Sequence, residues 1–203
     1  MIKKSIIFIT SILILNSCNM NDYSELNEGI YASLETSKGD ILLELFFKQT
    51  PLTVSNFVAL SEGNHPAADE QFSGKPYYDG LKFHRVIDNF MIQGGGFDEN
   101  MNDLESLKTI PNESGNGLSN LRGTIAMART SEPHSANAQF FINTKDNRSL
   151  NPKSGRWGYA VFGTVIEGME VVDKISKKPT GPKGRFTSDV PIETVLIMNI
   201  SIE

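Results

Sequence analysis

The chain has 203 residues and carries 19 Lys and Arg against 24 Asp and Glu, a formal net charge of −5. This acidic balance, without a basic patch, argues against binding to nucleic acid. The single cysteine excludes a disulfide framework and a cysteine-based metal site, and no histidine spacing is typical of metal ligands, so we expect neither a metal nor another cofactor.

The first residues have the features of a secretory signal. Lys3 and Lys4 precede an apolar run, 6–15, that is too short to span a bilayer. The run leads into Leu-Asn-Ser-Cys ending at Cys18, which resembles the lipobox of bacterial lipoproteins. That resemblance implies a signal peptide over 1–17, cleavage before Cys18, and lipidation of Cys18, which would make a membrane one partner of the protein. The alternative is an ordinary signal peptide with an incidental cysteine.

Lipidation predicts a location in the bacterial cell envelope, outside the cytoplasm. Asn19 is not the aspartate that retains lipoproteins at the inner membrane in some bacteria, so the outer membrane is favoured. Segment 18–28 is polar without a period, and we interpret it as a tether. Residues 29–203 are enough for one domain and too few for two.

The domain begins with a predicted hairpin followed by a helix. Strand-like patterns over 30–34 and 41–47 are separated by turn residues. Thr50 can cap a helix, and Pro51 suits its first position because the missing N–H is no loss there. Gly63 is typical of a helix end.

The rest of the chain predicts more strands, two long polar stretches and one short helix. Strands are expected over 81–87, 123–129, 139–143, 159–165 and 194–202, polar stretches over 64–76 and 98–120, a helix over 169–175, and a Gly/Pro-rich bend before the last strand. The result is mostly antiparallel β with two short helices, and these patterns do not decide between a barrel and a sandwich.

Two segments resemble the signature sequences of the cyclophilins. They are YYDGLKFHRVIDNFMIQGGGF over 77–97 and GTIAMARTSEPHSANAQFFIN over 123–143. The flanks TPLTVSNFVAL and VFGTVIEGMEVVDKI also agree, so the resemblance covers 29–203.

The cyclophilin resemblance implies a fold and an activity. The fold is a closed eight-stranded antiparallel β-barrel with a helix at each mouth and a groove on its outside. The activity is cis/trans isomerisation of X-Pro bonds in proline-containing polypeptides, here exported proteins whose folding it would assist. The groove binds an extended chain locally, so we expect a monomer.

The resemblance also implies the site residues. The catalytic set is Arg85, Gln93 and Phe90, and the substrate-binding set is Met91, Ala128, Arg129, Gln139, Phe141, Leu150 and Tyr159. Taken singly, Phe90, Phe141 and Leu150 fit a core as well as a pocket. By strand alternation, Arg85 is expected on the same face as Leu81, Phe83 and Ile87.

Three positions depart from better-known cyclophilins. Ser149 stands where many have a tryptophan and Tyr159 where many have a histidine, so catalysis is expected to persist while cyclosporin binds weakly. Arg129 replaces a common asparagine. Because the main chain is expected to pair with the substrate there, the effect should fall on substrate preference.

Other functions compete with isomerisation. The same groove could hold proline-containing segments without catalysis, as a binding module or chaperone. A hydrolase is disfavoured, because no serine lies in a nucleophile elbow and His84 and His134 read as structural. The glycines 94–96 lack the spacing of a nucleotide-binding fingerprint and are better explained by a tight turn with close backbone approach.

Overall fold

The computed structural model describes residues 26–66, 74–104 and 108–203. The predicted signal peptide, Cys18 and most of the tether therefore lie outside the described residues, as does the middle of the 64–76 stretch. Over the described ranges, no helix is both long and apolar enough to cross a membrane.

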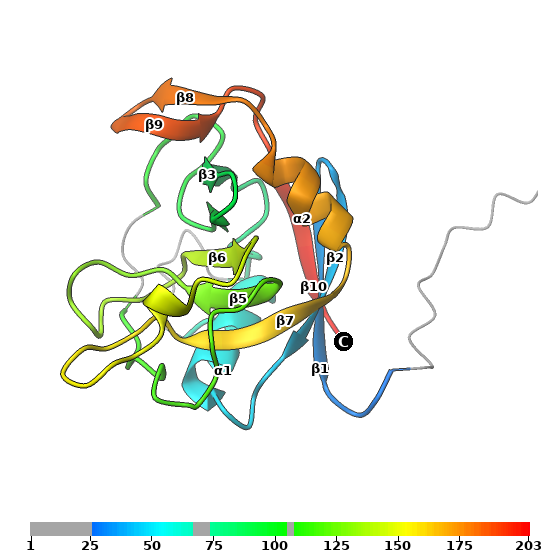
Figure 1. Ribbon diagram of the computed structural model, residues 1–203. Helices are drawn as coiled ribbons and strands as arrows, with labels where there is room; N and C mark the ends of the chain where they lie inside the picture. The colour runs from blue at the N-terminus through cyan, green and yellow to red at the C-terminus, as the bar shows by residue number, and fades with distance from the viewer. Residues whose placement is uncertain (1–25, 67–73, 105–107) are drawn as a thin grey trace, which may run out of the picture.

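Eight strands form one antiparallel sheet that curls around the main core (Figure 1). Its spatial order is β10-β1-β2-β7-β5-β6-β4-β3. The strands are β1 (Ile30–Thr36), β2 (Gly39–Leu45), β3 (Phe83–Ile87), β4 (Met91–Gly94), β5 (Thr124–Met127), β6 (Phe140–Asn143), β7 (Val161–Glu167) and β10 (Ile197–Ile202). The hairpin of β1 and β2 confirms the prediction from the sequence.

The expected closed barrel is wrong, because the sheet is open and turns through 242°. Near one end, the chain leading into β3 is joined to the chain leading into β10 by the bridge of Lys82 with Leu196 and by the N–H of Ile197, which donates to Leu81 O at 2.7 Å. The N–H of Phe83 donates to Val195 O at 3.0 Å beside that bridge. The pairing of β3 with β4 has a bulge between Phe83 and Arg85.

Two helices cover the curled sheet at opposite ends (Figure 1). They are α1 (Pro51–Ser61) and α2 (Met169–Ser176), and a short 3-10 helix, η1, spans Arg148–Leu150. The expected cap from Thr50 is not formed, because its hydroxyl donates to Phe46 O. Glu113, distant in sequence, instead accepts the N–H groups of Leu52 and Thr53 at 3.2 and 2.8 Å.

The sheet has apolar side chains on both faces. The concave face and the two helices enclose the main core, where Phe57 packs against Tyr78, Phe140 and Phe162 at ring distances of 5.3 to 5.8 Å. A second, smaller apolar cluster lies on the outer face, around Met91, Ala126, Phe141 and Val161. Alternate residues of one strand thus serve two different apolar clusters.

The bulge in β3 decides where Arg85 points. Phe83 and Val86 both lie in the main core, so the in-out alternation shifts by one residue between them. Arg85 therefore shares the outer face with Ile87, and the prediction that it lies on the same face as Phe83 is wrong. A bulge inserts one residue into a strand and leaves no clear mark in hydrophobic periodicity.

A hairpin replaces the Gly/Pro-rich bend expected from the sequence. It consists of β8 (Thr180–Lys183) and β9 (Phe186–Pro191), and Figure 1 shows it projecting beyond β3. Sequence reasoning missed it because β8 is a four-residue strand with no buried residue. Strand β4 was likewise not predicted as a separate strand, because only a short turn divides it from β3.

His84, within the bulge, is buried among aromatic rings and is 1% exposed. Its ring lies 4.5 Å from that of Phe97 and 5.7 Å from that of Phe186. Burial disfavours the charged imidazolium and lowers the pKa of His84 to about 3. The folded protein therefore holds this histidine neutral well below the pH at which an unfolded chain protonates it.

We predict a pH-dependent stability that His84 controls. Between pH 6.5 and about 3 the unfolded chain binds a proton that folded His84 does not. Acidification in that window should cost about 1.4 kcal/mol of unfolding free energy per pH unit. Urea unfolding of wild type and His84→Gln between pH 7.5 and 5 measures this. The variant should show a slope smaller by that amount below pH 6, with a constant offset above pH 7; equal slopes would contradict the assignment.

Candidate functional site

A cavity of about 210 Å³ opens on the outer face of the sheet, and we name it the outer groove. Strands β3, β4 and β6 contribute residues to it, and connecting segments supply the remainder. Its lining residues are Arg85, Phe90, Met91, Gln93, Ala128, Arg129, Phe141, Leu150 and Tyr159. The structure thus brings together nine of the ten site residues expected from the sequence, and only Gln139 lies outside this cavity.

The floor and walls of the outer groove are apolar. Met91 and Phe141 are buried in the outer-face cluster and form the floor. Phe90, Leu150 and Tyr159 are half-buried around them. The rings of Phe141 and Tyr159 meet edge to face at 5.7 Å. A cavity of this volume with an apolar floor has room for a proline ring.

A relay of polar side chains runs along one rim of the groove. Arg85 Nη1 donates to Gln93 Oε1 at 3.4 Å, and Gln93 Nε2 donates to Gln139 Oε1 at 3.0 Å. The register places these residues side by side, because Arg85 of β3 pairs with Gln93 of β4, which pairs with Phe141 of β6. Among the described residues no carboxylate forms an ion pair with Arg85. The guanidinium group is therefore oriented by the neutral amide of Gln93, which Gln139 supports in turn.

Arg129 has a structural task that the sequence did not reveal. Its guanidinium donates to four carbonyls, Thr130 O at 2.8 Å, Trp157 O at 2.9 Å, Gly158 O at 3.1 Å and, weakly, Ser131 O at 3.5 Å. It also lies over the ring of Tyr159 at 4.5 Å, a cation–π distance. Arg129 therefore braces the segment before β7 against the end of β5.

The backbone at Ala128 constrains how a substrate chain could pair there. The N–H of Ala128 already donates to Gln139 O at 2.9 Å. Any pairing of a peptide with Ala128 has to use its carbonyl. The sequence-based expectation of main-chain pairing at Ala128 and Arg129 stays a prediction.

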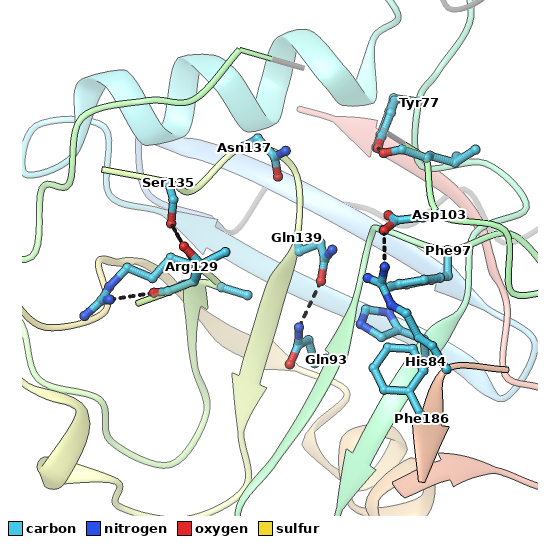
Figure 2. A pocket seen from close by; sticks show the side chains of 15 residues that line it. Tyr77, His84, Gln93, Phe97, Asp103, Arg129, Ser135, Asn137, Gln139 and Phe186 are labelled. Atoms are coloured by element: carbon cyan, nitrogen blue, oxygen red, sulfur yellow. Dashed lines mark hydrogen bonds and ion pairs between the residues drawn. The ribbon is translucent and has the colours of Figure 1, made fainter. Parts of the chain in front are cut away.

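A second cavity of about 510 Å³, the polar cavity, adjoins the outer groove and shares Gln93, Ala128 and Arg129 with it. Figure 2 shows Gln93 and Gln139 between Arg129 and Ser135 on one side and the rings of His84, Phe97 and Phe186 on the other. Gln139 thus supports the rim of one cavity while lining the other.

The glycine run 94–96 fits the close approach of Gln139. A Cβ on Gly96 would lie 2.5 Å from Gln139 Cδ, so any side chain at 96 would displace Gln139 from its observed position. Gly95 adopts a φ of +81°, which favours glycine. The run therefore permits tight packing beside the relay, as the sequence analysis expected in place of a nucleotide site.

The sequence did not predict one wall of the polar cavity. Arg185, at the tip of the β8–β9 hairpin, pairs with Asp103 at 2.8 Å and lies 4.8 Å from the centre of the Phe97 ring. Burial, with a smaller contribution from Asp103, raises the pKa of Tyr77 in the same wall. Asp103 comes from the polar 98–120 stretch, where nothing in the pattern marked it.

The three histidines contact different segments of the chain, and this arrangement does not support the hydrolase hypothesis. His84 lies among aromatic rings, His134 Nδ1 accepts the N–H of Asn112 at 3.0 Å, and His65 contacts Asn56. In the part of the chain that the structure describes, no three or more His, Cys, Asp or Glu residues are grouped so that they could hold a metal ion.

Comparisons with known proteins agree on one family. The family model described as cyclophilin type peptidyl-prolyl cis-trans isomerase matches residues 31–197. A peptidyl-prolyl cis-trans isomerase of Acinetobacter baylyi is 46% identical over 170 residues, covering 84% of each chain. Peptidyl-prolyl cis-trans isomerase B of Escherichia coli is 45% identical over 174 residues, which cover 84% of this chain and 98% of the relative.

Solved structures agree as well. A Cryptosporidium parvum cyclophilin-type isomerase matches with a TM-score of 0.68 at 28% identity, covering 86% of this chain and 98% of that one. A second structure of it, determined in the presence of the dipeptide Ala-Pro, matches with a TM-score of 0.67. With the curled sheet, its two helices and the groove on its outer face, these matches show that the chain belongs to the cyclophilin-type peptidyl-prolyl cis-trans isomerases.

Proposed function

We propose that this isomerase acts on X-Pro bonds of exported polypeptides and that the outer groove is its active site. The observation that carries the assignment is the position of Arg85. Its guanidinium, without a carboxylate partner among the described residues, lies at the rim of an apolar cavity of about 210 Å³. An apolar seat for a ring beside a fixed donor is the combination that prolyl isomerisation requires.

The chemistry needs no bond to be made or broken. Partial double-bond character gives the X-Pro bond a rotation barrier of about 18–20 kcal/mol. When the amide twists, resonance is lost and the prolyl nitrogen gains a lone pair. A donor aimed at that nitrogen stabilises the twisted amide more than either planar form, and this difference is what accelerates rotation.

Each group in the groove has a role in this proposal. Arg85 supplies the donor, because its guanidinium stays charged and holds several N–H groups in a rigid fork. Gln93 accepts from Arg85 and Gln139 supports Gln93, so the fork is oriented before substrate arrives. Met91 and Phe141 receive the proline ring, and their apolar surface disfavours the charge-separated planar amide.

Arg85→Ala should abolish most of the activity while leaving the fold intact. Loss of one preorganised donor of this kind typically costs about 10²–10³ in rate. Cis/trans exchange of a short Ala-Pro peptide, followed by NMR line broadening, measures the rate without a coupling protease. Arg85→Lys keeps the charge but loses the fork, so it should fall between wild type and Arg85→Ala.

The matched control is Arg148→Ala, which removes an arginine whose side chain is 67% exposed and whose ion pair with Asp146 is long, at 3.6 Å. It should retain wild-type exchange. Activity in Arg85→Ala equal to wild type would remove Arg85 from the mechanism. A wild type that binds the peptide without accelerating exchange would favour the binding-module alternative.

We also propose that the protein is a monomeric lipoprotein, anchored through Cys18 outside the cytoplasm and preferentially in the outer membrane. Support comes from the signal-like segment 1–17 and the lipobox-like residues before Cys18. The chain from Cys18 to Gly29, when extended, reaches at most about 35–40 Å. That tether would keep the outer groove within a few tens of ångströms of the membrane surface.

The anchor is tested with the full chain expressed in a Gram-negative host. Wild type should remain in the membrane fraction after alkaline carbonate washing, because several acyl chains hold firmly where one does not. Cys18→Ala should appear in the soluble envelope fraction. Arg85→Ala, which keeps Cys18, is the control and should stay with the membrane.

Mass spectrometry of the mature N-terminus decides the chemistry of the anchor. An acylated peptide beginning at Cys18 is the expected species. An unmodified N-terminus at another residue would show that Cys18 is incidental and that the leader is an ordinary signal peptide.

A further inference from the structure

Three walls of the outer groove stand outside the ladders of the sheet. Phe90 lies in the turn between β3 and β4, Leu150 ends η1, and Tyr159 precedes β7. Strand residues are held by their hydrogen-bonded neighbours, whereas residues in connecting segments move more unless other groups hold them. The spacing of these three walls therefore depends on contacts that the sheet does not supply.

Three asparagines, which we name the asparagine network, are buried behind these walls. Asn120 and Asn143 are 0% exposed and Asn147 is 3% exposed. Asn147 Nδ2 donates to Asn143 Oδ1 at 2.7 Å, and Asn143 Nδ2 donates to Asn120 Oδ1 at 3.3 Å. The three side chains thus form one connected chain of amides across the connecting segments.

Side chains of the network bond to the backbone of two of the three walls, and the third wall is bonded to the main chain of Asn147. Asn147 Nδ2 donates to Phe90 O at 2.7 Å, and the Leu150 N–H donates to Asn147 O at 2.8 Å. Asn120 Nδ2 donates to Tyr159 O at 3.3 Å. The walls at Phe90 and Tyr159 are therefore tied to one connected set of side chains, and the wall at Leu150 is tied to the main chain of a residue in that set.

Buried amides make such a set rigid. A buried donor or acceptor is costly to leave unbonded, so each amide resists any movement that breaks its contacts. Linked hydrogen bonds inside a protein also strengthen one another. Asn143 is tied further to the sheet, because its Nδ2 donates to Thr124 Oγ1 at 2.9 Å, at the start of β5.

We propose that the asparagine network is a positioning device that sets the distance between Phe90, Leu150 and Tyr159 so that the groove accepts a proline ring. This inference rests on the proposed role of the outer groove. The network acts on the seat for the ring, while Arg85 is oriented separately through Gln93. Binding and rate should therefore respond to different substitutions.

The test is Asn147→Leu, which keeps the branched shape of the side chain but removes its two donated hydrogen bonds. NMR line-shape analysis of an Ala-Pro tetrapeptide gives both the Kd and the exchange rate in the bound state. Because a small misfit in an apolar pocket costs tenfold or more, we expect the Kd to rise about tenfold. The bound-state rate should stay within about twofold of wild type, since Arg85 is untouched.

The matched control is Thr36→Val, a near-isosteric change in the β1–β2 hairpin. Thr36 is 7% exposed, its Oγ1 donates to Gly39 O, and it lines neither cavity. Thermal unfolding of both variants shows how far each is destabilised. The control should lose stability with an unchanged Kd, which separates positioning of the groove from support of the fold.

A milder variant covers the case in which Asn147→Leu does not fold. Asn151 is half-buried, and its Oδ1 accepts the Asn120 N–H at 2.8 Å and Asn120 Nδ2 at 3.2 Å. Asn151→Ala should raise the Kd by roughly threefold in the same direction.

Other results would overturn the inference. An unchanged Kd in the folded variants would leave the network a purely structural role. A lowered bound-state rate at unchanged Kd would mean that the network acts through Arg85. Wild type that binds without exchange would instead count against the proposed function, and the Kd comparison would still decide the role of the network.

Discussion

Arg85 has to remain charged next to apolar surface, and the construction of the site follows from this constraint. A guanidinium cannot lose its proton, and desolvating it is costly unless polar groups surround it. A carboxylate partner would lower that cost but would also neutralise the charge on which the proposed mechanism depends. The structure uses neutral amides instead, with Gln93 accepting from Arg85 and Gln139 supporting Gln93. The glycine at 96 leaves the space in which Gln139 can reach its partner.

The strands that hold the core together also build the groove, because one face of each strand packs in the core and the other face lines the groove. Phe140 of β6 packs with Phe57 in the main core, while its neighbour Phe141 forms part of the groove floor. The bulge in β3 makes the same division for Arg85, whose neighbour Val86 stays in the core. The floor therefore lies directly on strands whose other face packs in the core, whereas Phe90 and Tyr159 are bonded to buried side-chain amides outside the ladders.

The sequence predicted the regular strands and helices from their periodicity, and it predicted which residues line the site from a family resemblance. Periodicity found the first hairpin and helix α1, whereas the grouping of Arg85 with residues as distant as Tyr159 came only from the resemblance to the cyclophilins. What was missed depends on contacts between distant segments. The cap of α1 comes from Glu113, and the hairpin tip at Arg185 is fixed by its pairing with Asp103. The face on which Arg85 lies follows from a bulge, which alters alternation by one residue and cannot be separated from ordinary variation in a single sequence.

The most direct measurement is a crystal structure of the chain with the dipeptide Ala-Pro, the ligand present with the related Cryptosporidium parvum isomerase. The account predicts the proline ring on Met91 and Phe141 in the outer groove, with the guanidinium of Arg85 beside the Ala-Pro amide. A proline ring seated in the polar cavity, or an Ala-Pro amide out of reach of Arg85, would contradict the account.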